Sequence, residues 1–160
     1  MRFSHELTYD AAPATVLTML GDPVFREKVC VAMHTARHDV TVDGSGPGMS
    51  VVVDQTQPAR GIPSFAMKFV GEEIRIVQRE SWQDAAAASL DLEIPGKPGT
   101  FHGTIALSEK GSGTMETVTG EVTVKLPIIG GRLEGLVADL LRQALRAEER
   151  VGHAWLAEGR

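Results

Sequence analysis

The sequence predicts an α+β domain in which a curved antiparallel β-sheet of about seven strands packs against one long C-terminal helix. Two short helical segments follow the first strand, and strand-like segments joined by turns then continue to about residue 127. An amphipathic stretch of about 28 residues closes the chain, and at 1.5 Å per residue it would form a helix about 42 Å long. The apolar stripe of such a helix needs a broad partner, and the sheet is the only candidate.

Composition is typical of a globular protein of about one domain. The chain has 160 residues, of which 42% are hydrophobic and 23% charged, and its net charge is −5,. This acidic balance disfavours a nucleic-acid partner, and the single cysteine, Cys30, excludes an intramolecular disulfide. The opening MRFSHELTYD lacks the apolar core of a signal peptide, and no run of about 18 apolar residues is present,. We therefore expect a cytoplasmic monomer or homodimer without stable membrane insertion.

The first third of the chain predicts a strand followed by two helices. Residues 3–9 alternate between an apolar and a polar face, which is typical of a strand,. Residues 14–20 have the apolar spacing of a short helix after a proline, and a glycine ends it,. Asp22 is a good N-cap for a second helix, with Pro23 at its first position and its end near Ala32,.

The middle of the chain predicts an antiparallel meander. Close spacing of short alternating segments, with turn sequences such as DGSGPG and PGKPG between them, favours consecutive hairpins,. The expected strands cover residues 35–42, 49–56, 65–70, 74–82, 86–94, 100–109 and 114–126. We expect no helix in this part of the chain.

The segment KLPIIGGRLEG, residues 125–135, allows two interpretations of its glycine pair. A phosphate-binding loop needs a Lys-Ser/Thr pair at the helix start, and Gly130-Gly131 is followed by Arg132 and Leu133 instead,. Pro127 suits the end of a strand, and the glycines allow a sharp turn,. The pattern favours a joint between the last strand and the last helix, with the phosphate-binding loop as the alternative.

The order of elements resembles the START and birch-pollen-allergen-like superfamily, also called SRPBCC. The opening FSHELTYDAAPATVLTML, the strand end RIVQRESW and the segment VTVKLPIIGGRLE before the last helix carry the resemblance. It covers nearly the whole chain, as one domain over residues 1–160, and lies closest to a branch of domains of unknown function. The resemblance implies the helix-grip fold, with a cavity between sheet and helix. It also implies that Arg132 lies beside this cavity, where it would meet an anionic head group; a surface ion pair with Glu134 is the alternative.

Candidate ligand-binding residues come from the strand over residues 74–82 and from the apolar face of the last helix. If Gln78, Glu80 and Trp82 face inward, the two polar side chains are buried and need partners. A buried Glu80 is then a candidate general acid or base, and a carboxylate bonded to a neighbour is the alternative. The candidates for the ligand site are Gln78, Glu80, Trp82, His5, Arg132, Leu136 and Leu140.

No catalytic residue, metal or cofactor is expected. On a strand His34 and His38 share a face but stand about 13 Å apart, too far for one ion. Cys30 is expected to be a buried, inert thiol. The favoured function is binding or transport of a hydrophobic small molecule, such as a lipid, polyketide or isoprenoid. The alternatives are a cyclase- or aromatase-type enzyme and a protein-interaction module without a ligand.

Overall fold

The computed structural model describes residues 1–159 and, within them, contains one seven-stranded sheet and four helices. In chain order the elements are β1 (Arg2–Tyr9), α1 (Pro13–Leu20), α2 (Pro23–Ala32), β2 (Arg37–Asp43), β3 (Ser50–Pro58), α3 (Ser64–Val70), β4 (Glu73–Trp82), β5 (Ala87–Glu93), β6 (Gly99–Lys110), β7 (Gly113–Val124) and α4 (Gly130–Ala157). None of these helices is both long and apolar enough to cross a membrane.

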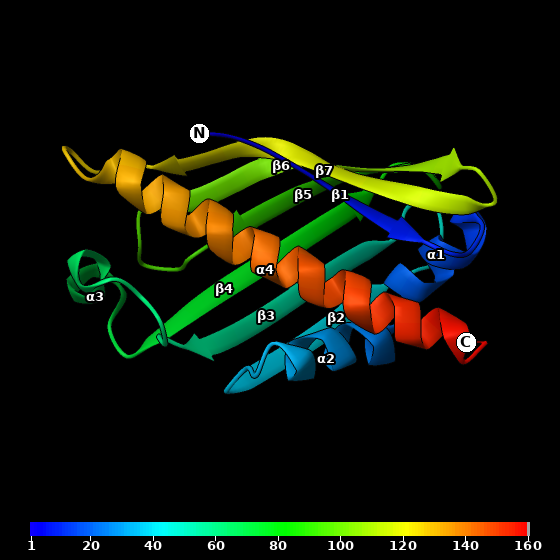
Figure 1. Cartoon of the computed structure of the whole chain (residues 1–160), viewed down its shortest axis with the longest axis horizontal. Helices are drawn as coiled ribbons and strands as arrows, with labels where there is room; N and C mark the ends of the chain where they lie inside the picture. Colours follow the sequence, from blue (N-terminus) through cyan, green and yellow to red (C-terminus); the bar gives the residue numbers. More distant parts are fainter. Residues whose placement is uncertain (160) are drawn as a thin grey trace.

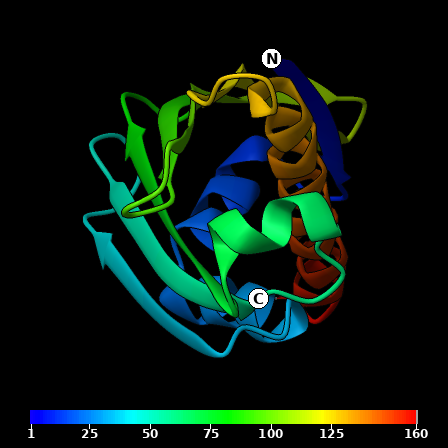
Figure 2. The same cartoon turned by 90° about the vertical axis from the view of Figure 1, so that its left-hand side faces the viewer.

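The sheet is antiparallel throughout, with the strand order β1-β7-β6-β5-β4-β3-β2. Strands β1 and β2 therefore lie at opposite edges, and α1 and α2 carry the chain between them. Figure 1 shows α4 running along the sheet, and Figure 2 shows the sheet curving around the space beside this helix. The predicted fold, a curved antiparallel sheet with one long C-terminal helix and two short helices after the first strand, is confirmed.

The predicted start of α2 is confirmed in detail. The side chain of Asp22 accepts a hydrogen bond from the backbone N–H of Val24 at 2.9 Å, and Pro23 occupies the first turn. A capping side chain satisfies a donor that has no partner inside the helix. The cap therefore fixes where α2 begins, and it sets which residues of α2 face the sheet.

The glycine pair is the joint between β7 and α4. A Cβ atom on Gly130 would lie 2.6 Å from the backbone oxygen of Val124, so no larger residue fits without a shift of the backbone. The N–H of Gly130 donates to the carbonyl of Leu126 at 3.2 Å, which closes the turn. From this joint α4 buries an apolar stripe that includes Leu141 and Leu145. The joint interpretation of the sequence is thus the one that the fold supports.

The prediction of a strand over residues 65–70 is wrong, because this segment forms helix α3. Its alternating Phe65, Met67 and Phe69 mimic a strand, but a segment of seven residues is too short for periodicity to decide between the two,. Pro63 precedes the helix, and Gly71, with φ of 77°, ends it. Figure 2 shows α3 lying across one end of the space between the sheet and α4.

The strand placement of His34 is also wrong. Strand β2 begins at Arg37, and His34 lies in the turn after α2 with φ of 58°. Histidine tolerates this left-handed conformation better than β-branched residues do. His38 does lie on β2, where its Nδ1 and the hydroxyl of Thr35 are 3.0 Å apart. The two histidines therefore do not share a strand face.

Candidate functional site

A cavity of about 250 Å³ lies between α4 and the concave side of the sheet. Leu136 and Leu140 of α4 form one wall, and Ile76 of β4 and Phe101 of β6 belong to the opposite wall. Phe69 of α3 lines the end that this helix covers in Figure 2. Apolar side chains predominate in the lining, so burial of apolar ligand surface would supply most of the binding free energy.

The volume sets the size of molecule that fits. At about 30 Å³ per non-hydrogen group, the share of one water molecule in the liquid, the cavity accommodates about eight groups. This is the size of an eight-carbon chain or of a small bicyclic molecule.

A smaller chamber of about 50 Å³ adjoins the inner end of the cavity. The two spaces share the side chains of Met33, Gln55, Gln78, Leu141 and Ala144. By the same measure the chamber accommodates one or two groups, about the size of a polar head or a water molecule. It is lined by several buried ionisable side chains, which come from α2, β4, β7 and α4.

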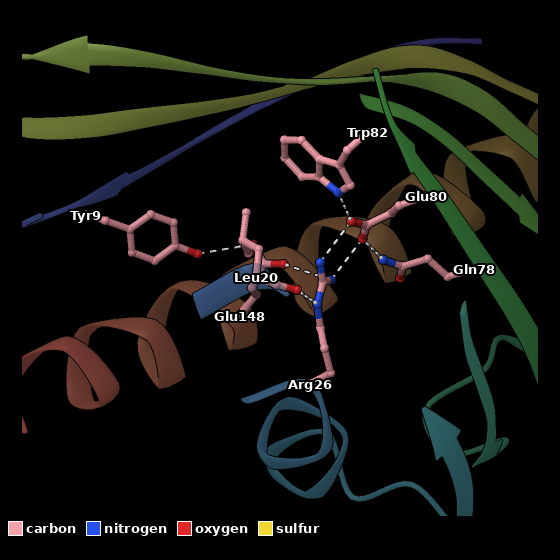
Figure 3. Close-up of polar contacts among 7 residues, drawn as sticks. All are labelled: Tyr9, Leu20, Arg26, Gln78, Glu80, Trp82 and Glu148. Carbon is pink, nitrogen blue, oxygen red and sulfur yellow. Dashed lines mark hydrogen bonds and ion pairs between the residues drawn. The ribbon is translucent and has the colours of Figure 1, made fainter. Parts of the chain in front are cut away.

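The first of these side chains form a buried ion pair between α2 and β4. Both nitrogens at the end of the Arg26 guanidinium donate to the Glu80 carboxylate at 2.8 Å, and Nε donates to the carbonyl of Leu20 at 2.7 Å (Figure 3). Arg26 and Glu80 are only 4% and 3% exposed. Burial lowers the pKa of Arg26, but the surrounding acidic groups, Glu80 first and then Glu148, together more than compensate, so this pKa lies above its ordinary value. The guanidinium therefore remains charged inside the protein.

Two further donors complete the surroundings of Glu80. Nε2 of Gln78 donates to one carboxylate oxygen at 2.6 Å, and the indole N–H of Trp82 donates to the other at 3.1 Å. Figure 3 shows that all of these groups point toward the carboxylate from β4 and α2. With four donors directed at it, Glu80 is held as a hydrogen-bond acceptor. This arrangement favours the bonded alternative over a role as a general acid.

A pair of carboxyl groups lies beside the ion pair. The hydroxyl of Tyr9 donates to Oε2 of Glu148 at 3.1 Å, and Oε1 of Glu148 lies 3.8 Å from Nη1 of Arg26. Burial, and then the charge of Glu148 and a hydrogen bond with it, raise the pKa of Glu116 well above its usual range. Burial also raises the pKa of Glu148, although Arg26 opposes this effect. The pair can therefore hold a proton where free carboxyl groups would not.

The structure brings most of the predicted ligand-site residues to these two spaces. Gln78, Leu136 and Leu140 line the cavity, and Gln78 and Glu80 line the chamber. Trp82 reaches the site through its hydrogen bond to Glu80.

The other two candidates lie elsewhere. His5 is half-buried on β1, outside the lining of either space, where burial and the charge of Arg146 lower its pKa. Arg132 is exposed at the start of α4, and its guanidinium lies 4.0 Å from the centre of the Phe65 ring. Neither residue lines the cavity or the chamber.

The chamber also contains three charged residues that the sequence did not predict for the site: Arg26, Glu116 and Glu148. Two of them left a signal, since Glu148 interrupts the apolar stripe of α4 and Glu116 alternates with Val118 on the inward face of β7. A charged residue on an otherwise apolar face is rarely buried unless it is paired. Arg26 left no such signal, because α2 carries charged residues on several sides.

The remaining reactive groups do not form a second centre. The thiol of Cys30 is buried and lines the chamber, and burial raises its pKa to about 11. Within residues 1–159, no three His, Cys, Asp or Glu side chains are arranged to hold a metal ion.

Comparison with known proteins gives a family match and several structural likenesses. The model of a family described as "Protein of unknown function (DUF2505)" matches residues 4–156. Uncharacterized protein Rv0481c of Mycobacterium tuberculosis (strain ATCC 25618 / H37Rv) is 26% identical over 119 residues, which cover 71% of this chain and 68% of that protein.

Two solved structures illustrate the shared fold. The di-domain ARO/CYC StfQ from the steffimycin biosynthetic pathway matches 98% of this chain and 50% of its own, with a TM-score of 0.68 and 15% identity. Norcoclaurine synthase from Thalictrum flavum, in complex with dopamine and hydroxybenzaldehyde, matches 94% of this chain and 85% of its own, with a TM-score of 0.60 and 16% identity. These likenesses confirm the helix-grip fold that the resemblance to the SRPBCC superfamily implied.

Proposed function

The chain belongs to the DUF2505 family, and from the geometry of its own cavity we propose that it binds or transports a hydrophobic small molecule between α4 and the sheet. The molecule is of the lipid, polyketide or isoprenoid kind, with about eight to ten non-hydrogen atoms inside the protein. The observation that carries the proposal is the apolar cavity of about 250 Å³, which the side chains of sheet and helix leave unfilled. Well-packed protein interiors rarely contain empty spaces larger than a water molecule.

The end covered by α3 supports entry of a ligand. Phe69 of this short helix lines the cavity, while Met67 on the same helix is 42% exposed. The helix has seven residues, and its buried Ala66 packs with Val124 and Leu133. A displacement of α3 would break this packing and open the end of the cavity.

The test is a calorimetric titration with 1-octanol, which has nine non-hydrogen atoms. We expect a Kd on the order of 100 μM, which corresponds to about 0.6 kcal/mol per non-hydrogen atom. Ala144 lines both spaces, so Ala144→Phe should fill their junction and weaken binding at least tenfold. Gln143→Phe adds the same ring at the neighbouring exposed position and should leave the affinity unchanged. Absence of binding to the wild-type protein, or equal affinities in all three proteins, would exclude the cavity as the site.

A cyclase- or aromatase-type enzyme remains the second candidate, and one observation favours it. Such an activity needs at least two converging polar groups with displaced pKa values, and Glu116 and Glu148 meet this description beside the chamber,. A protonated Glu116 would act as the general acid. If the protein turns over a polyketide-like ligand, Glu116→Gln should abolish the reaction and leave ligand binding intact.

The interaction-module alternative has less support. It predicts an interior filled by side chains, whereas this interior holds a cavity next to a polar chamber. The fully exposed Ile128 lies in the loop between β7 and α4, but a single exposed side chain does not make an interaction surface,.

A further inference from the structure

One buried polar atom in the chamber has no hydrogen-bond partner among residues 1–159. This atom is Oε1 of Glu116, a residue that is only 1% exposed and lines the chamber. Leaving a buried polar group without a partner costs free energy, and such groups in native proteins usually find one in water or a ligand. The position of this oxygen at the inner end of an apolar cavity points to the polar end of the ligand.

The surroundings of Glu116 decide what kind of group it needs. Burial and the neighbouring charge of Glu148 raise the pKa of Glu116. Oε1 is a carboxyl oxygen with no donor directed at it from residues 1–159. A ligand group that donates a hydrogen bond would satisfy this oxygen.

The charges around the chamber exclude one class of head group. Among residues 1–159, Arg26 is the only cation in the chamber lining, and both ends of its guanidinium are already engaged by Glu80. Glu80 and Glu148 supply negative charge, so a carboxylate or phosphate in the chamber would meet like charge, and the guanidinium beside it is already paired. A hydroxyl group meets an acceptor without a charge of its own, and the two carboxylates outnumber the single guanidinium around an ammonium group,.

We propose that the chamber is the head-group subsite of the ligand cavity, in which Oε1 of Glu116 accepts a hydrogen bond from an alcohol or an amine. The apolar body of the ligand then lies along Leu136 and Leu140, and its head passes between Gln78 and Ala144 to reach Glu116. This inference rests on the proposed ligand-binding function and names the class of ligand, namely an amphiphile with one hydrogen-bond-donating end.

Three probes with the same eight-carbon chain test the proposal: 1-octanol, 1-octylamine and octanoate, titrated at pH 7.5 by calorimetry. We expect the alcohol and the amine to bind at least tenfold more tightly than octanoate. Octanoate affinity equal to that of the alcohol would overturn the head-group assignment. Equal binding of all three probes would leave the proposed function standing and refute this subsite. If none of the three binds, the proposed function fails and the subsite fails with it.

Two substitutions of Glu116 provide the matched comparison. Glu116→Gln retains a side-chain oxygen that can accept a hydrogen bond from the ligand, so the alcohol should bind within about threefold of the wild-type affinity. Glu116→Leu has a similar volume without an acceptor and should weaken binding of the alcohol and the amine at least tenfold. Circular dichroism and the urea midpoint of both variants establish that the fold is intact. Wild-type affinity for the alcohol in a folded Glu116→Leu protein would refute the role of this oxygen.

Discussion

Replacement of Arg26 by methionine tests the buried ion pair, because it removes the cation and keeps an unbranched chain of similar length. The substitution deletes the two hydrogen bonds to Glu80 and the bond to the carbonyl of Leu20. Glu80 then retains only the neutral donors of Gln78 and Trp82. An acidic group that was paired at 3% exposure becomes a buried charge without a counter-ion.

The expected cost follows from this geometry. Removal of one partner of a buried ion pair lowers the free energy of unfolding by about 3–5 kcal/mol. For a protein of this size each kcal/mol shifts the thermal midpoint by about 2–4 °C, so Tm should fall by about 6–20 °C. The double variant Arg26→Met/Glu80→Gln also removes the charge of Glu80, and its amide oxygen can still accept from Trp82. It should recover at least half of the lost stability.

The assay is urea unfolding of the wild type, the single variant and the double variant, followed by tryptophan fluorescence. Arg79→Met is the matched control, since it breaks an ion pair with Glu93 in which both side chains are about half exposed. This control should leave the urea midpoint nearly unchanged. A loss below about 1 kcal/mol in Arg26→Met, or a double variant less stable than the single one, would refute the account of the ion pair.

Three further predictions concern the carboxyl pair, the long helix and the thiol. Because burial raises the pKa of Glu116, the folded protein retains a proton that the unfolded chain releases above about pH 4.3,. The free energy of unfolding should therefore fall as the pH rises toward the pKa of the folded state, by up to about 1.4 kcal/mol per pH unit. Urea unfolding at pH 5 to 8 should show a smaller slope for Glu116→Gln, and an unchanged slope would contradict the shift. A Cβ at position 152 would clash with the Tyr9 ring, so Gly152→Ala should lower the free energy of unfolding by about 1–3 kcal/mol,. A Cβ at position 135 would meet nothing within 4 Å, so Gly135→Ala should stabilise α4 by about 0.5–1 kcal/mol,. Thermal unfolding of both variants measures these changes. Cys30 should react with a disulfide reagent at least a hundredfold more slowly in buffer than in 6 M urea, because the thiol is buried and its pKa is about 11. Comparable rates in the two solutions would show that the chamber is open to solvent.

The secondary structure was predictable where short-range physics decides it. The cap of Asp22 with Pro23 after it, the glycine-rich turns and the apolar stripe of α4 are local signals, and each marks an element that the structure contains. The strand predicted over residues 65–70 failed because α3 is short and its side chains alternate by chance. In that case packing over the end of the cavity, a tertiary effect, determines the conformation.

The candidate site was predictable only in part, and for a physical reason. Alternation along β4 placed Gln78 and Glu80 on one face, because the period of two is a property of a single strand,. The partners of Glu80 come from α2 and α4, and no pattern within one element shows that Arg26 lies opposite β4. The assembly of Arg26 and Glu148 around Glu80 depends on the crossing of helices and sheet, which only the fold supplies.

The most direct test of the ligand cavity is a titration of methyl-labelled protein with 1-octanol, followed by NMR. We expect shifts of the methyl signals of Leu92, Leu136 and Leu140, which line the cavity. We expect no change at the exposed Val24 and Val31 of α2. Saturation without any change in the three leucines, or shifts confined to the surface of α2, would show that the space between α4 and the sheet does not hold the ligand.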